Sequence, residues 1–369
     1  MNKEVFGAIC TFVGIAVGAG IFGLPYVFSK AGFFTGLLTL ILVFFVMLFV
    51  TLYLGEILLR TKGRHQLSGL AAKYLGTKGK TIMFVANFLS IIGGLSAFII
   101  GASNSLFALF GYNQILFQIL FFVFVAPVVY FNFNIIEEFE SLFTPIKVLI
   151  VLFLSFLLFN YMDFHNLQGF NFFNFLVPYG VLIFSFTGIS SLPVINESLK
   201  NKKSLFFVIV FGLIIVLLIN LLFVSSVLGS VNSVSDMATV SLSKLGSSIG
   251  IFSNLFALFC MTTAFVALGF ALKENLTLDY KIKNLPAWLI VVLFPLVLLF
   301  FHFSFVKIIN LTGAIAIGII LFLILIMHSR SKFLGNRKPE YSLKDNLFFK
   351  VLISIVLIVG IVYSLIGVF

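Results

Sequence analysis

Gly20-Ile-Phe-Gly-Leu-Pro25 and Gly188-Ile-Ser-Ser-Leu-Pro193 share one Gly-Ile-x-x-Leu-Pro pattern, and each copy lies within a long apolar stretch. Glycine weakens a helix and proline lacks the amide hydrogen that a helix needs, so both copies should interrupt a helix. In a bilayer, such an interruption persists only where protein buries it or water reaches it. Matching interruptions in the two halves of a membrane chain are typical of a transporter's binding site.

The composition places the chain in a membrane. Apolar residues make up 61% of the chain and charged residues 9%, and the mean hydropathy is +1.22. Runs of about 20 apolar residues are long enough to span a bilayer as helices. They predict eleven spans, at residues 5–28, 33–59, 81–110, 114–132, 143–160, 172–198, 204–228, 245–272, 285–301, 305–327 and 347–368.

The distribution of basic residues predicts the orientation. Most of the 23 Lys and Arg residues fall in loops on the same side as the N-terminus, so that side should be cytoplasmic and the C-terminus outside. The acidic residues Glu137, Glu138 and Glu140 lie on the same predicted inner side, where they count little in this rule. The net charge of +11 thus reflects topology and attraction to anionic lipid, and it does not indicate nucleic acid. The expected location is the plasma membrane.

The repeated pattern also predicts the architecture, an all-α polytopic membrane protein forming one transmembrane domain over residues 1–369. Five spans make a first repeat at about 5–160, five more make a second at about 172–327, and an extra helix follows at 347–368. Because five is odd, the repeats insert in opposite orientations and bring broken helices 1 and 6 together near the midplane. The alternative is that the pattern arose twice by chance in Gly- and Leu-rich sequence.

The two breaks should bind the two ends of a zwitterion. The amides of Ala19, Gly20 and Ile21 begin the outer half of the first broken helix, and a helix N-terminus attracts a carboxylate. The segment from Phe184 to Gly188 ends the outer half of the sixth helix, where exposed carbonyls suit an ammonium group. The side chain bound there would lie beside Phe184, Phe186, Thr187 and Ser90.

Four stretches resemble the amino acid/polyamine/organocation superfamily of LeuT-fold carriers, especially its amino acid/auxin and aromatic amino acid permease branches. They are Gly18-Ala-Gly-Ile-Phe-Gly-Leu-Pro25, Leu54-Gly-Glu-Ile-Leu-Leu-Arg60, Phe184-Ser-Phe-Thr-Gly188 and Met261-Thr-Thr263. The resemblance implies a five-plus-five inverted repeat, alternating access and ion-driven amino acid uptake. It also implies roles for Gly18, Ala19 and Gly20 in carboxylate binding, for the carbonyls of Ala16 and Phe184 in amine binding, and for Phe184 as a gate.

The resemblance does not decide which of two ions, sodium or the proton, drives transport. Sodium-coupled relatives bind the ion with carbonyls of the first span and hydroxyls of the eighth, which correspond here to Gly14, Val17, Thr262 and Thr263. Proton-coupled relatives place a lysine of the fifth span at that position, and Lys147 is similar. Two plainer interpretations are that Lys147 extends to the inner headgroups and that the threonines bond to carbonyls of their own helix.

Other classes of protein fit less well. An intramembrane enzyme needs a nucleophile, a metal site or paired carboxylates at depth, and the spans contain no His-Glu-x-x-His motif or paired aspartates. A channel needs a lined path rather than one interrupted site. We therefore expect a secondary transporter of neutral, apolar or aromatic L-amino acids that uses no cofactor and no obligatory protein partner. Proton symport is favoured, and a sodium symporter, an exchanger and a sensor of the same fold are the alternatives.

Overall fold

A computed structural model describes residues 3–131 and 134–367, and describes side chains outside 132–141. All regular elements in these ranges are helices, as predicted. The acidic residues Glu137, Glu138 and Glu140 lie outside the described side chains, although the backbone is helical from Asn134 onward, where a loop was predicted.

The elements follow the predicted spans closely. In the first half they are α1 (Lys3–Ala16), α2 (Ala19–Ala31), α3 (Phe33–Leu59), α4 (Leu67–Phe110), α5 (Gln114–Val125), η1 (Val128–Tyr130) and α6 (Asn134–Phe159). The connection contains η2 (Phe164–Leu167) and η3 (Phe172–Asn174). The second half contains α7 (Tyr179–Ser185), η4 (Ile189–Ser191), α8 (Leu192–Ser198), α9 (Ser204–Ser230), α10 (Ala238–Leu242), η5 (Ser243–Leu245), α11 (Ser247–Leu278), α12 (Asn284–Leu299), α13 (Phe305–Leu311), η6 (Thr312–Ile317), α14 (Gly318–Leu334) and α15 (Leu347–Ile366).

Length and hydropathy identify eight spanning helices among the described residues, and a ninth if the bent pair α1 and α2 is one span. The shorter apolar helices Gln114–Tyr130 and Asn284–Leu299 stand where the fourth and ninth spans were predicted. Counting eleven spans requires that both short helices cross the membrane, so that total stays a prediction.

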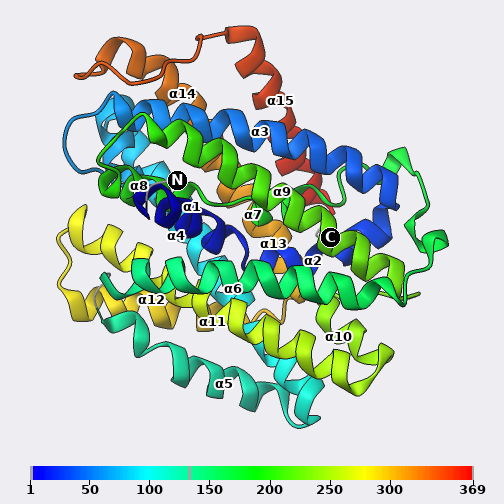
Figure 1. The fold of residues 1–369 in the computed structure, drawn as a ribbon. Coiled ribbons are helices and arrows are strands. Elements are labelled where there is room, and N and C mark those ends of the chain that lie inside the picture. The colour runs from blue at the N-terminus through cyan, green and yellow to red at the C-terminus, as the bar shows by residue number, and fades with distance from the viewer. Residues whose placement is uncertain (1–2, 132–133, 368–369) are drawn as a thin grey trace.

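Both predicted interruptions are present. The axes of α1 and α2 differ by 50°, and Gly18 between them has the non-helical dihedrals φ −117° and ψ −133°. In the sixth span, α7 ends at Ser185 and the chain resumes as η4 and α8 only after Phe186, Thr187 and Gly188. Figure 1 shows α1, α2 and α7 in the middle of the bundle, between α3 and α15 on one side and α5 and α12 on the other.

The polar connection predicted at 60–80 is shorter in the structure. Helix α4 begins at Leu67 and bends at Gly76, whose φ of +75° is left-handed and favours glycine. A short helix therefore precedes the third span, because leucines and alanines before Gly76 provide an apolar face: Leu67, Leu70, Ala71 and Tyr74 are buried.

The loop between α14 and α15 is fastened to the predicted inner end of α3. The buried carboxylate of Glu56 accepts hydrogen bonds from Arg60 Nε at 2.8 Å, Lys332 Nζ at 2.5 Å and the Leu343 amide at 2.8 Å. His328 Nε2 lies 2.9 Å from the same carboxylate. The i,i+4 pair of Glu56 and Arg60 is thus one part of a larger network, which joins α3 to α14.

Candidate functional site

The two broken helices meet at Gly20 and Ser185. A Cβ atom added to Gly20 would lie 2.6 Å from Ser185 Cα and 2.8 Å from Ser185 Cβ, distances that no side chain can occupy. Glycine therefore allows the backbones of α2 and α7 to touch. Asn220 of α9 donates a hydrogen bond to the Ser185 hydroxyl at 3.1 Å and supports this contact from behind. The Cα of Gly20 faces the neighbouring helix, so its amide is the part that remains for a ligand.

The first turn of α2 offers backbone donors. The Gly18 amide donates to the Ala16 carbonyl at 2.9 Å, and Gly18 provides no side-chain cap. Within the described chain, the amides of Ala19, Gly20 and Ile21 make no hydrogen bond to another element. Such amides carry the positive end of the helix dipole, so this turn can bind a carboxylate. Gly18 itself packs against Phe98 and Ala264, each 3.2 Å from an added Cβ.

The carbonyl groups at the two breaks accept hydrogen bonds from short turns. The Phe184 carbonyl accepts the amides of Thr187, at 3.1 Å, and of Phe186, and the Ile183 carbonyl accepts the Thr187 hydroxyl at 2.8 Å. The Ala16 carbonyl accepts the Gly18 amide at 2.9 Å. Because a carbonyl oxygen has two lone pairs, the Ala16 oxygen can accept a further donor such as an ammonium group, whereas an ammonium group at the Phe184 oxygen would replace one of these turn contacts.

The aromatic side chains of the sixth span point in different directions. The Phe184 ring lies against α4, where a Cβ added to Gly94 would be 3.4 Å from Phe184 Cζ. The Phe186 ring packs on Phe44 of α3, with ring centroids 6.1 Å apart. The Ser90 hydroxyl donates to the Asn87 carbonyl at 3.0 Å, within its own helix. Phe184 is thus the aromatic side chain that faces α4, and Phe186 belongs to the packing against α3.

Lys147 is fully buried and reaches the first span. Its Nζ donates a hydrogen bond to the Gly14 carbonyl at 3.2 Å. One turn earlier, the Thr144 hydroxyl donates to the Cys10 carbonyl at 3.0 Å. Two side chains of α6 therefore bind carbonyls of α1, and the Lys147 amine lies next to the first break rather than at the headgroups.

The threonines of the eighth span bond within their own helix. The Thr262 hydroxyl donates to the Leu258 carbonyl at 2.8 Å, and the Thr263 hydroxyl donates to the Cys260 carbonyl at 3.1 Å. Both side chains are half-buried. Val17 donates its amide to the Val13 carbonyl at 2.8 Å. Of the residues in the predicted sodium set, Gly14 is the one whose carbonyl accepts the lysine amine.

Sequence reasoning missed the neighbours that hold the breaks in place. Phe98 and Ala264 contact Gly18, and Asn220 supports Ser185. An asparagine inside an apolar run is a signal for an interhelical hydrogen bond, but it does not identify the partner. Phe98 and Ala264 carry no such signal, because apolar residues occur throughout these spans.

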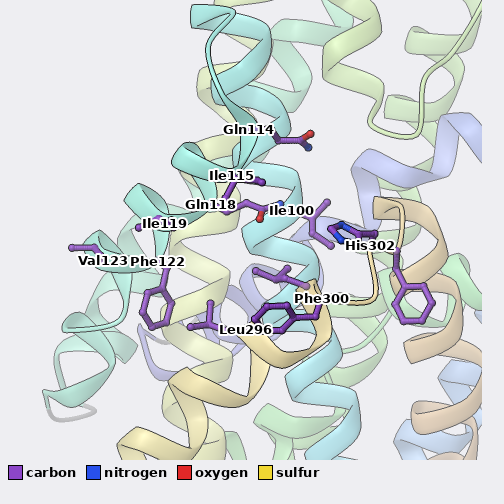
Figure 2. A pocket seen from close by; sticks show the side chains of 12 residues that line it. Ile100, Gln114, Ile115, Gln118, Ile119, Phe122, Val123, Leu296, Phe300 and His302 are labelled. Carbon is purple, nitrogen blue, oxygen red and sulfur yellow. The ribbon is translucent and has the colours of Figure 1, made fainter.

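A separate groove of about 760 Å³ lies away from both breaks, between α4, α5 and the end of α12 (Figure 2). Its wall is mostly apolar, and Gln114, Gln118 and His302 are the polar residues that line it. None of its lining residues belongs to either break. The groove therefore lies apart from the site assembled from the broken helices.

Comparison with known proteins identifies the family of the chain. The family model of the tryptophan/tyrosine permeases matches residues 1–366. The chain belongs to the tryptophan/tyrosine permease family. Taken with its apolar helices, this membership makes the permease a multi-pass membrane protein.

Two further proteins are similar to this permease. Glutamine transporter 2 of Aliivibrio fischeri is 22% identical over 289 residues, which cover 74% of each chain. The crystal structure of MhsT in complex with L-phenylalanine superposes with a TM-score of 0.68 and 14% identity, covering 100% of this chain and 99% of MhsT. At that identity the likeness shows the fold, which is LeuT-like, with broken first and sixth helices.

Proposed function

We propose that this permease is a secondary transporter that carries neutral, apolar or aromatic L-amino acids by alternating access, coupled to protons. The observation that carries the proposal is the contact of the two broken helices at Gly20 and Ser185. It brings the donor amides of α2 close to the acceptor carbonyls in the last turn of α7. Donors and acceptors at one place complement the carboxylate and the ammonium of one amino acid.

Apart from Lys147, whose amine lies beside the first break, the residues at the breaks are uncharged, which supports a neutral substrate. The turn from Val17 to Ile21 and the turn from Phe184 to Gly188 contain only apolar residues, glycine, serine and threonine. A cationic or dicarboxylic side chain entering this low-dielectric site would need an opposite charge to offset its desolvation. Phe184 instead offers an aromatic face, which suits an apolar or aromatic side chain.

The comparisons support a neutral substrate. The family is named for tryptophan and tyrosine, the curated relative for glutamine, and MhsT was solved with L-phenylalanine. The side chains of these four amino acids are uncharged. What they share is the zwitterionic backbone, and backbone groups at the two breaks are suited to bind that part.

Lys147 supports proton coupling. Its amine donates to the Gly14 carbonyl close to the first break, so a change in its protonation would alter a contact between α6 and α1. The alternative, sodium coupling, requires Thr262 and Thr263 to turn their hydroxyls from Leu258 and Cys260 toward an ion.

Uptake into proteoliposomes tests the proposal. Radiolabelled tryptophan, tyrosine, phenylalanine, glutamine and lysine are supplied under an imposed proton gradient or an imposed sodium gradient, in separate experiments. The variants are Lys147→Ala and the double variant Thr262→Val with Thr263→Val. Lys244→Ala is the matched control, since Lys244 is exposed and bonds only to Ser233 at the surface.

We expect proton-driven uptake of neutral amino acids, loss of that uptake in Lys147→Ala, and wild-type uptake in Lys244→Ala. Sodium-driven uptake that survives Lys147→Ala and fails in the threonine variant would move the coupling site to α11. Saturable binding without net uptake under either gradient would identify an exchanger or a sensor. Absence of both binding and uptake for every amino acid would refute the proposed substrate class.

We also propose the plasma membrane as the location, with the N-terminus cytoplasmic and the C-terminus outside. The support is the asymmetry of basic residues between alternate loops. Reporter fusions at the two termini, one active only inside the cell and one active only outside, test this orientation.

A further inference from the structure

The tenth span contains a π-helical turn next to the candidate site. Residues Thr312–Ile317 form the π turn η6 between α13 and α14. In a π turn each amide reaches five residues back instead of four, so the turn holds one residue more than an α-helical turn. Such turns are rare, and they occur frequently at functional sites. The position of η6 therefore calls for an explanation.

The π turn touches α7 backbone to backbone. A Cβ atom added to Gly313 would overlap the Gly180 carbonyl oxygen and would lie 3.0 Å from the Phe184 amide nitrogen. A Cβ atom added to Gly180 would overlap the carbonyl and side-chain oxygens of Asn310. The extra residue of the π turn thus brings the tenth span against the helix whose last turn carries Phe184.

The same turn touches α4. A Cβ atom added to Gly93 would overlap the Thr312 hydroxyl and would lie 3.0 Å from Thr312 Cγ2. The next residue, Gly94, faces the Phe184 ring at 3.4 Å. Helix α4 therefore presents one glycine to the π turn and the adjacent glycine to the Phe184 ring, while the π turn itself contacts the backbone of α7 at Gly180 and Phe184.

The junction retains buried polar atoms. Among the described residues, Asn310 Oδ1 and the Tyr179 hydroxyl are buried and have no hydrogen-bond partner. Unsatisfied buried groups are costly, and an apolar residue at Asn310 would avoid that cost. Asn310 and Tyr179 flank the contact with Gly180, and α13 and α7 lie side by side at the centre of the bundle (Figure 1).

We propose that the π turn, through Gly313 and Asn310, positions the end of α7 and the Phe184 ring, and thereby sets the size of amino acid side chain that the permease accepts. Gly313 and Asn310 are positioning residues, since they act through Phe184. The inference rests on the proposed function, because it assigns the specificity of that same site. Without the extra residue the turn would withdraw from Gly180 and from the Phe184 amide, and the backbone that carries the ring would lose this contact.

Deletion of Ala314 tests the proposal. Removing one residue turns the π turn into an α-helical turn and leaves the register of α14 unchanged. Gly318→Ala is the matched control, because it lies just after the turn and its added methyl meets only side-chain atoms of Ile361, at 3.2 Å. The readout is the ratio of KM for L-alanine to KM for L-tryptophan in proteoliposome uptake. A loss of stability alone would lower the amount of active protein without changing this ratio.

We expect the deletion to change the ratio by about tenfold or more, the scale on which pocket size discriminates hydrophobic substrates. Gly318→Ala should stay within about twofold of wild type, the scatter common for contacts outside such a pocket. Asn310→Leu serves as a second variant if the deletion prevents folding, and we expect it to change the ratio in the same direction. An unchanged ratio in the variants that fold would overturn the proposal.

A fluorescence experiment separates this proposal from the proposed function. Trp288 is the single tryptophan of the chain, so Trp288→Phe combined with Phe184→Trp places one reporter at the ring position. Its emission maximum is compared with and without Ala314, in the absence of any amino acid. A shift on deletion is the expected result, and an unchanged maximum would contradict the positioning role. If the wild-type protein transports no amino acid in the uptake experiment and the emission maximum still shifts on deletion, the proposed function has failed while the positioning role holds.

Discussion

The amine of Lys147 donates a hydrogen bond to the carbonyl oxygen of Gly14 at 3.2 Å, which ties α6 to α1 near the point where the first span breaks. Lys147 is fully buried, and the Thr144 hydroxyl makes a parallel bond to the Cys10 carbonyl at 3.0 Å. Under the proposed mechanism, the protonation state of one side chain acts on the position of α1.

Thr144→Val should weaken the link between α6 and α1 without removing the coupling group. The change deletes one buried hydrogen bond, which contributes about 0.5–1.5 kcal/mol. We expect proton-driven uptake to persist at a reduced rate, in contrast to its loss in Lys147→Ala. The measurement is initial uptake as a function of external pH. Complete loss of uptake in a folded Thr144→Val protein would show that the contact of Lys147 with α1 is not the decisive one for proton-driven uptake.

Gly20→Ala should disrupt the contact between the broken helices. The added methyl would lie 2.6 Å from Ser185 Cα, and backbone cannot rotate away as a side chain can. We expect a destabilisation of about 1–3 kcal/mol together with loss of uptake. Gly23→Ala is the control, because its nearest neighbours would be at 3.4 Å, an ordinary contact. Melting temperature in detergent distinguishes the two, and equal temperatures would contradict the prediction.

Gly55→Ala should destabilise the protein through the Tyr341 side chain. The added methyl would overlap the Tyr341 hydroxyl, which donates to the Leu52 carbonyl at 2.8 Å. Tyr341→Phe removes that hydroxyl and loses one hydrogen bond. In a double-mutant cycle we expect the two substitutions together to cost less than the sum of their separate effects, since the second relieves the clash of the first. Additive effects would refute this explanation of Gly55.

Glu56→Gln should be strongly destabilising. The Glu56 carboxylate is buried and accepts hydrogen bonds from Arg60, Lys332 and the Leu343 amide. Neutralising it leaves the half-buried cations of Arg60 and Lys332 without a counter-charge, a loss of up to about 3–5 kcal/mol. Glu197→Gln is the matched control, because its partner Arg64 is exposed and a surface pair contributes less than about 1 kcal/mol. Chemical unfolding of both variants tests the difference, and similar midpoints would contradict it.

Acid should loosen the loop between α14 and α15 at Asp345. Burial raises the pKa of the Asp345 carboxyl, but hydrogen bonds from Lys350 and Ser329 outweigh this effect and hold the pKa below its ordinary value. A lowered folded-state pKa stabilises the fold above the unfolded pKa of about 4, and this contribution is lost as pH falls through the folded value. We expect melting temperature to fall less steeply in Asp345→Asn than in wild type between neutral pH and about pH 3. Parallel curves would show that Asp345 does not contribute.

Much of the fold was predictable because its signals are local. Span positions follow from runs of apolar residues, and the two breaks follow from the glycine and proline of each copy of the pattern. The start of α4 at Leu67 was missed, because its short first segment is too polar to read as a span and became visible only when its apolar face packed. The π turn at Thr312–Ile317 was missed as well, since its one glycine does not distinguish it from other glycine-containing stretches of the spans.

The sequence by itself determined that the chain crosses a membrane many times and breaks twice, because hydropathy and backbone preference belong to neighbouring residues. Only the tertiary structure decided which way each residue faces. Gly20 turns its Cα toward Ser185, and Phe186 turns toward Phe44. Lys147 turns inward to Gly14 rather than toward the headgroups. Side-chain direction depends on what packs against each face of a helix, and in uniformly apolar helices no periodic pattern marks that face.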